Sequence, residues 1–369
     1  MKRIVIFIAA FSYAVCAHAG GFEQVNLSAA GAGVANAFAA TANDASAVAY
    51  NPAGIAWLPG VSVSAGGSIN FRNSSVKIPG GIAPNKGTEP SDGYLYATWA
   101  PRDSRFAGGI GFSPLYVIDN NWQDAFGTAS GLSKLSVYRT TADLVYAISS
   151  DLAVGMGGDW YVTHANLTQG LNSFQGNDLG SFGGHASLMW KPLPTWSLGA
   201  VVRSGTNISI SGKANDNMSF KLPDQVTLAL AHDSAQVWRL ETDVKWTRWS
   251  ALKNMNVIKA GVVTQPNNMN LRDTLTAMLG LTWTWRMGTQ VRIGYAYEQG
   301  ANRSRNFNPM IAGQDAQRVS LGGGGNLFGI HADLAYQYVF YSNKTATGPY
   351  AGNYRDRQQS VMFTVSNQF

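Results

Sequence analysis

The sequence predicts an all-β protein, an antiparallel transmembrane β-barrel of about 14 strands with an N-terminal, partly helical plug inside it. Charged residues make up only 13% of the chain, against about 25% in a typical soluble domain. From Val61 onward, segments of about ten residues alternate between apolar and polar positions, as the strands of outer-membrane barrels do. The chain begins with an export signal, and no later window has the roughly 18 consecutive apolar residues of a membrane-spanning helix.

Residues 1–19 have the three parts of a secretory signal peptide. Lys2 and Arg3 are followed by an apolar run from Ile4 and then by Ala17-His18-Ala19, a cleavage site of the A-x-A type. The one cysteine, Cys16, lies in this segment. It could accept a lipid, but Val15 stands where a small residue is needed, so we favour an apolar residue that is lost with the signal. The mature chain then has no disulfide.

Residues 20–60 are predicted to form the plug. This segment is dense in Ala and Gly, lacks the period-2 alternation of the rest of the chain, and closes on Asn51-Pro52-Ala53-Gly54. In that motif Pro fixes one φ angle and Gly supplies a permissive one, which indicates a turn. We expect Asn51 to satisfy backbone groups of the plug or the wall, and favour this structural role over ligand contact.

Residues 61–369 are predicted to form the barrel wall. The last alternating segment ends on Phe369. Aromatic residues gather at strand ends, as in the interfacial girdles of membrane barrels: Trp246, Trp249, Trp283, Trp285, Tyr295, Tyr297, Tyr338 and Tyr341. These two features favour a barrel over a secreted β-sandwich, in which the apolar face would cover a core. The expected strands are 61–71, 92–101, 106–116, 135–149, 151–163, 182–191, 195–206, 224–233, 235–247, 273–285, 288–299, 316–326, 327–341 and 358–369.

The connections between these strands alternate in length. Some are tight, such as Asp233-Ser234 and Gly325-Asn326, and they are expected to be periplasmic turns. The others are long, polar and rich in Asn, Gly and Ser, and they are expected to be extracellular loops: 72–91, 117–134, 164–181, 207–223, 250–272, 300–315 and 342–357. Apolar residues in the 250–272 stretch suggest that it folds against the rim or extends the strands.

The third expected strand has an unusual composition. It contains Gly108, Gly109, Gly111 and Pro114, and glycine and proline inside a strand mark bulges or lost ladder hydrogen bonds. We therefore predict a kink at Gly109, Gly111 and Pro114. The alternative is an ordinary bend near the barrel rim.

The candidate ligand contacts are charged residues at the alternate strand positions that are expected to face the lumen. An arginine or lysine at the end of an apolar pocket could hold a carboxylate, and Arg139, Lys245 and Arg292 are the candidates. The alternative, which we favour, is that the charges pair with each other or with the plug. The other inward charges are Asp143, Asp243, Glu298, His331 and Asp333.

Motifs for catalysis, metals and cofactors are missing from the sequence. There is no G-x-S-x-G or H-E-x-x-H motif, and the histidines are isolated. Gly31-Ala32-Gly33 lacks the third glycine of a dinucleotide site, and the run Gly322 to Gly325 is expected to leave room against the plug. The net charge of +6 is too diffuse for nucleic acid. We expect no enzyme activity, no cofactor and no metal.

Four regions of the chain resemble one family of outer-membrane proteins. The chain is similar to the FadL/TodX transporters of long-chain fatty acids and hydrophobic compounds, over essentially the whole mature sequence. The regions that carry the resemblance are the Gly21-Phe22 start with Asn43-Asp44-Ala45-Ser46 and Tyr50-Asn51-Pro52-Ala53-Gly54, Gly109-Ile110-Gly111 with Pro114, Leu222-Pro223-Asp224 with Asp243 to Ser250, and Arg272-Asp273-Thr274 with Arg292 to Tyr297.

The resemblance implies a monomeric barrel whose N-terminal hatch, the plug, blocks the pore near the periplasmic side. Ligand would leave sideways through an opening at the kinked third strand. We therefore expect passive uptake of hydrophobic small molecules, such as long-chain fatty acids or aromatic hydrocarbons, across the outer membrane of a Gram-negative bacterium. Outer-membrane lipids and the barrel-assembly machinery would be the other partners. The alternative is a surface barrel that acts mainly as an adhesin or phage receptor.

Overall fold

The computed structural model describes most of the mature chain. It covers Glu23 and residues 26–88, 91–127, 132–169, 172–234, 237–265, 268–285, 288–302, 307, 309, 313–348 and 350–369. The predicted signal peptide, residues 1–19, lies outside the described residues. No helix among the described residues is long and apolar enough to cross a membrane.

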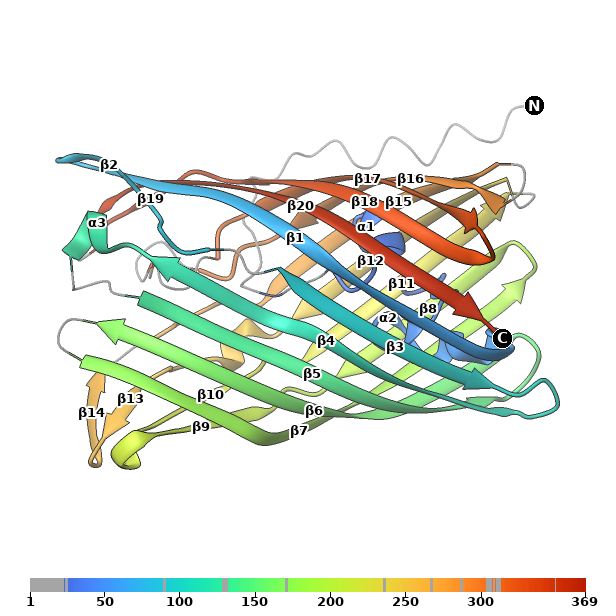
Figure 1. Cartoon of the computed structure of the whole chain (residues 1–369), viewed down its shortest axis with the longest axis horizontal. Helices are drawn as coiled ribbons and strands as arrows, with labels where there is room; N and C mark the ends of the chain where they lie inside the picture. Colours follow the sequence, from blue (N-terminus) through green and yellow to red (C-terminus); the bar gives the residue numbers. More distant parts are fainter. Residues whose placement is uncertain are drawn as a thin grey trace.

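Within the described residues, fourteen strands form a closed antiparallel barrel (Figure 1), which confirms the predicted fold class and strand number. Closure is made by β1 and the last strand, β20, which pair from Ser62–Gln368 to Lys77–Asn353. The strands are β1 (Gly60–Ile78), β3 (Asp92–Ala100), β4 (Phe106–Asn121), β5 (Leu132–Ala147), β6 (Leu152–Gln169), β7 (Asn172–Leu193), β8 (Trp196–Arg203), β11 (Gln225–Ser234), β12 (Trp238–Thr247), β15 (Thr274–Thr284), β16 (Gln290–Glu298), β17 (Ala316–Leu327), β18 (Ile330–Tyr341) and β20 (Gly352–Gln368).

Alternation along each strand sorts side chains between the membrane and the lumen. In β15, Leu279, Leu281 and Trp283 are exposed on the outside, whereas Thr276 and Met278 are buried inside. An apolar exterior and a polar interior suit a wall that meets lipid on one side only. Trp249 departs from the predicted girdle: it is buried in the barrel interior and packs edge-on against Tyr116.

The two ends of the barrel differ in how their strands are connected. At the right-hand end of Figure 1, tight turns join the strands and the C-terminus lies at the rim; we call this the short-turn end. The opposite, long-loop end carries α3 (Gln123–Phe126) and six short strands. These are β2 (Gly81–Pro84), β9 (Asn207–Gly212), β10 (Asn217–Lys221), β13 (Val257–Lys259), β14 (Val262–Gln265) and β19 (Lys344–Ala346).

Several stretches expected to be long loops are instead strand. β6 continues to Gln169 and β7 begins at Asn172, so most of 164–181 is paired. The expectation was wrong because it relied on apolar alternation. A strand that has left the lipid keeps its ladder hydrogen bonds but no longer needs an apolar outer face.

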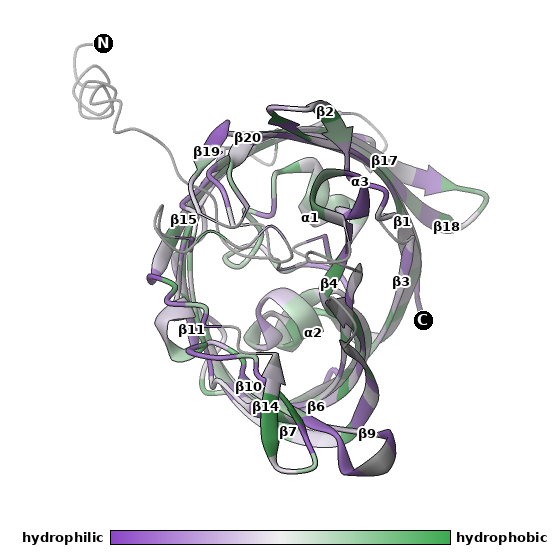
Figure 2. Cartoon of the chain, turned by 90° about the vertical axis from the view of Figure 1, so that its left-hand side faces the viewer, coloured by the Kyte–Doolittle hydropathy of each residue, from purple (hydrophilic) through white to green (hydrophobic). Residues whose placement is uncertain are grey.

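The described part of the predicted plug, residues 26–59, lies inside the barrel, and we call it the inner segment. It contains the short helices α1 (Ala29–Gly33), α2 (Ala47–Tyr50) and the 3₁₀ helix η1 (Pro52–Trp57). Figure 2, which looks into the barrel from the long-loop end, shows α1 and α2 within the ring of strands. Ser28 caps α1 by accepting a hydrogen bond from the Gly31 amide at 3.1 Å.

Candidate lumenal binding site

Two carboxylates of β12 hold the middle of the inner segment. Asp243 accepts hydrogen bonds from the amides of Phe38 (3.1 Å) and Ala39 (3.0 Å). Glu241 accepts from the amides of Ala40 (2.6 Å) and Thr41 (3.2 Å), and also from the Thr41 hydroxyl. Together the two carboxyl groups accept five hydrogen bonds from this stretch. The pair therefore fixes four consecutive residues that form no regular helix.

Asn51 ties the inner segment to the wall. Its amide donates to the carbonyls of Ala39 (2.7 Å) and Leu188 (3.1 Å), and its side-chain oxygen accepts from the Ala53 amide at 3.2 Å. Pro52 begins η1, and Gly54 lies where a side chain would meet the Ala42 carbonyl. The Asn51-Pro52-Ala53-Gly54 motif thus turns the chain and contacts the wall at the same point.

Glycines allow the inner segment to touch the wall backbone. A Cβ at Gly294 would lie 2.2 Å from the Val34 carbonyl carbon, and one at Gly322 would lie 2.8 Å from Gly33 Cα. The second contact confirms the expectation for Gly322, the first glycine of the run, whereas a Cβ at Gly323, Gly324 or Gly325 would meet only wall residues. Gly109 plays the same part in β4, where a Cβ would lie 2.5 Å from a methyl of Val48.

β4 leaves the regular wall near its midpoint. Its pairing with β3 ends at Leu95–Phe112, whereas its pairing with β5 continues to Asn121 and shifts register between Pro114 and Tyr116. Ile110 and Phe112 are still exposed outward, but every residue from Ser113 to Asn120 is buried. The strand therefore turns inward after Phe112, and one of its edges lacks β3 as a neighbour.

The free edge of β4 faces two other parts of the chain. Glu23 forms an isolated antiparallel bridge to Tyr116. Further along, the Lys86 amide donates to the Asn121 carbonyl at 2.9 Å. Among the predicted kink residues, Pro114 lies at the register shift, while Gly109 and Gly111 lie against the inner segment, next to Val48.

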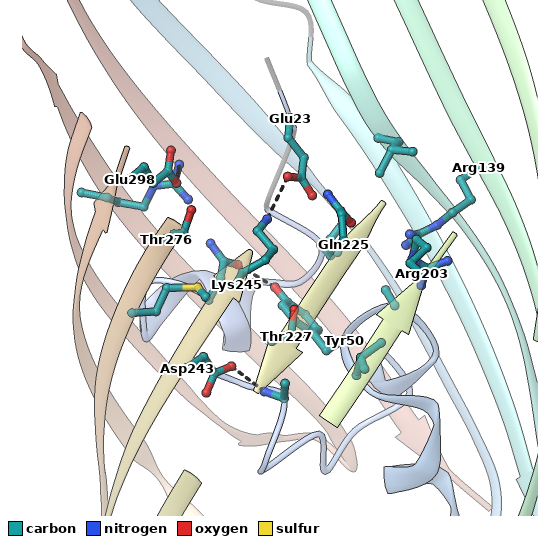
Figure 3. Close-up of a pocket in the computed structure, with 18 residues that line it drawn as sticks. Glu23, Tyr50, Arg139, Arg203, Gln225, Thr227, Asp243, Lys245, Thr276 and Glu298 are labelled. Atoms are coloured by element: carbon teal, nitrogen blue, oxygen red, sulfur yellow. Dashed lines mark hydrogen bonds and ion pairs between the residues drawn. The ribbon is translucent and has the colours of Figure 1, made fainter. Parts of the chain in front are cut away.

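A cavity borders the inner segment inside the barrel, and charged side chains surround it (Figure 3). The cavity itself measures about 80 Å³ and opens into the lumen. Arg139 and Arg203 lie on one side of this cavity and Glu298 and Thr276 on the other, as Figure 3 shows. Lys245 pairs with Glu23 at 2.8 Å.

Arg139 is the predicted ligand contact with the weakest partners. It is buried, its closest carboxylate contact is Asp159 at 3.9 Å, and Ser113 lies at 3.5 Å. Its Nε atom has no hydrogen-bond partner among the described residues. A buried guanidinium without good partners is costly, so this group is available to an anion or a polar ligand atom.

The other two candidates are paired. Lys245 binds Glu23, and Arg292 donates to Asp333 at 2.6 Å outside this cavity. Arg292 instead borders a polar cavity at the short-turn end, beside Asp44 of the inner segment. Burial raises the pKa of the Asp44 carboxyl, and hydrogen bonds from Ser46 oppose that shift.

Sequence reasoning missed a buried network next to Arg139. His185 lies 2.6 Å from Asp143 and 3.1 Å from Asp159, and Arg203 binds Asp159. Alternation could have placed Arg203 inside, because Val202 next to it is exposed to lipid. It could not show which strands bring the groups together, since that depends on cross-strand register.

The long-loop side of the cavity is apolar. A large group of buried side chains, which we call the lumenal apolar cluster, lies in this half of the barrel, and Leu115 belongs both to it and to the cavity wall. The cluster consists of Leu115, Tyr116, Ile118, Leu135, Val137, Tyr161, Ala165, Leu167, Phe174, Ile208, Ile210, Met218, Phe220, Leu222, Trp249, Leu252, Met255, Val257, Met269, Leu271 and Ala301. A molecule at Leu115 could therefore contact apolar groups on one side and Arg139 on the other.

The part of the chain that the structure describes holds no group of three or more His, Cys, Asp or Glu side chains placed to bind a metal ion.

Comparisons with known proteins agree with this architecture. The sequence matches the family described as outer membrane protein transport protein (OMPP1/FadL/TodX) at residues 10–203 and 180–368. Outer membrane protein P1 of Haemophilus influenzae is 22% identical, over 88% of this chain and 86% of its own.

Solved structures show the same fold at low sequence identity. A FadL homologue of Pseudomonas aeruginosa superposes with a TM-score of 0.83 at 16% identity, covering 95% of this chain and 100% of its own. The toluene transporter TodX of Pseudomonas putida gives 0.67 at 17% identity, covering 88% and 94%. The toluene transporter TbuX of Ralstonia pickettii gives 0.68 at 17% identity, covering 94% and 100%.

Proposed function

Because the chain belongs to the outer membrane protein transport family that includes OMPP1, FadL and TodX, we propose that it carries hydrophobic small molecules across the outer membrane by passive diffusion. As a member of this family it resides in the outer membrane of a Gram-negative bacterium. The barrel acts as a monomer, and the ligand's concentration gradient drives uptake.

One observation carries the proposal: the lumenal apolar cluster meets the charged cavity at Leu115. A purely aqueous pore needs no large apolar group in its interior, whereas a site for hydrophobic ligands is mostly apolar with a few placed polar groups. The ligand's apolar part lies against the cluster, and a polar end, where it has one, points to Arg139. The protein thus accepts neutral hydrocarbons and binds carboxylates more tightly.

The inner segment acts as the hatch that blocks the straight path to the periplasm. Glu241, Asp243 and Asn51 hold it to the wall, and small residues let it pack closely. Ligand in the cavity therefore leaves elsewhere. The inward turn of β4 after Phe112 leaves a strand edge without β3 as a neighbour, and we assign the lateral exit to this place.

Uptake by cells tests the transport function. Cells with and without the gene are given labelled oleate and labelled toluene, and the gene should increase entry of at least one. Equal uptake of both molecules in the two strains would contradict transport and favour a surface barrel that serves as an adhesin or phage receptor.

The role of Arg139 has its own test. Arg139→Gln should lower oleate uptake by about tenfold, because a charge-assisted contact is lost, and should leave toluene uptake unchanged. Arg102→Gln, in an exposed turn, is the control for removing one positive charge. Equal losses for oleate and toluene would show that Arg139 only supports the wall.

The lateral exit can be tested by straightening β4. Leu115 is the extra residue at the register shift against β5, so its deletion should restore regular pairing and reduce uptake of both ligands. The matched control is deletion of Gly180. This residue lies in the stretch of β7 where the register against β6 shifts, and a side chain there would meet nothing within 4 Å. Full uptake by an inserted barrel that lacks Leu115 would exclude this exit.

A further inference from the structure

Three positive side chains lie together on the outside of the barrel near the long-loop end. Arg355 and Arg357 are exposed on β20, and Lys77 is exposed on β1. The two strands are direct neighbours, as Figure 1 shows, and their register pairs Arg357 with Asn73, Arg355 with Ser75 and Asn353 with Lys77. Successive outward rows are roughly 7 Å apart, so the cations form a short column up the wall.

No described residue neutralises this column. None of the three cations has an ion pair or side-chain hydrogen bond with another residue that the structure describes. Asp356 lies between Arg355 and Arg357 in the sequence, but its carboxylate faces the lumen and binds Arg72 at 3.0 Å. The outward partners Asn73, Ser75 and Asn353 carry no charge.

Aromatic side chains lie at the lower end of the column: Phe340 is beside Arg357, and Phe71 and Tyr338 are one row further down. Phe71, Tyr338 and Phe340 are on the outward faces of β1 and β18, and the rings of Tyr338 and Phe340 are 4.4 Å apart. Phe340 pairs with Arg357 and Phe71 with Gln359. Since aromatic girdles mark the membrane interface, the cations stand at the height of the lipid headgroups in the outer leaflet.

We propose that Lys77, Arg355 and Arg357 bind the phosphate groups of the phosphorylated glycolipid in the outer leaflet. Arginine binds phosphate through paired hydrogen bonds, and the neighbouring phosphates of lipid A offer two anions to the three cations. The acyl chains pack over Phe71, Tyr338 and Phe340. This site lies outside the lumen and is separate from the transport path.

Native mass spectrometry of the full-length barrel in detergent tests this site. The probes are lipid A with both phosphates, the same lipid without phosphates, and inorganic phosphate. Arg355→Gln with Arg357→Gln should weaken binding of phosphorylated lipid A by roughly thirtyfold, the ratio expected when each cation contributes comparably at a membrane surface. Lys77→Gln alone should have a smaller effect in the same direction.

The matched control is Arg102→Gln with Arg105→Gln, which removes two exposed arginines at the opposite end of the barrel. It should bind phosphorylated lipid A as the unmodified protein does. The proposal is overturned if the Arg355/Arg357 variant binds that lipid unchanged, if the dephosphorylated lipid binds equally well, or if inorganic phosphate alone reproduces the binding.

Discussion

The two halves of the lumen are filled in different ways. The short-turn half holds the inner segment, whose small residues touch the wall backbone and whose amides bind Glu241 and Asp243. The long-loop half holds the lumenal apolar cluster, with large side chains such as Tyr161 and Phe174. A segment that must keep one position needs directional hydrogen bonds and close fit. A space that accepts varied hydrophobic ligands needs apolar surface that can adjust.

The strongest test of this contrast removes the hydrogen bonds of the short-turn half. Glu241→Ala with Asp243→Ala should lower the free energy of opening the segment from Phe38 to Thr41 by roughly 2.5–7.5 kcal/mol, because five hydrogen bonds are lost and each contributes about 0.5–1.5 kcal/mol. Hydrogen exchange of those amides measures the change. Glu241→Gln with Asp243→Asn keeps the acceptors and should cost less. Undiminished protection in the alanine variant would show that close fit alone holds the segment.

A smaller effect is expected from one added methyl group. Gly294→Ala places a Cβ 2.2 Å from the Val34 backbone, and overpacking of this kind costs about 1–3 kcal/mol. Thermal unfolding of the purified barrel should show the loss. Gly323→Ala is the control, because its Cβ would meet no atom closer than 3.5 Å. Equal melting temperatures for both variants would mean that the inner segment shifts freely against the wall.

The sequence predicts local features of this protein better than contacts between distant parts of the chain. Period-2 alternation is a local property, so the barrel and the inward direction of Arg139 and Asp243 could be read from the chain. The partners of Asp243 and Arg203 could not, because they depend on register and on where the inner segment lies. The long-loop half was also misread, since β6 and β7 continue beyond the apolar belt without an apolar pattern.

The long-loop half should tolerate a change of shape that keeps volume. Met218→Leu with Met255→Leu should cost less than about 1.5 kcal/mol per site but should narrow the range of ligand sizes taken up, because methionine adapts its shape more easily. Uptake of a series of fatty acids of increasing length measures this range. Met189→Leu, beside the inner segment, is the control and should leave the range unchanged. An unaltered range in the double variant would place ligand selection outside the cluster.

The smallest effect concerns the ion pair between Glu23 and Lys245, which lies at the boundary of the two halves (Figure 3). Both side chains are mostly buried, with 14% and 13% of their surface exposed, so the coupling energy should lie near the upper end of the roughly 0.2–1 kcal/mol that is typical of solvent-exposed pairs, at about 1 kcal/mol. A double-mutant cycle with Glu23→Gln and Lys245→Gln should give a value in that range, measured by thermal unfolding.

Glu23 also bridges the free edge of β4 at Tyr116, so the same variants should speed uptake modestly if the bridge opens during transport. A coupling energy well above this range would contradict the prediction. It would show that the pair helps to hold the inner segment to the wall, so that Lys245 belongs to the short-turn half.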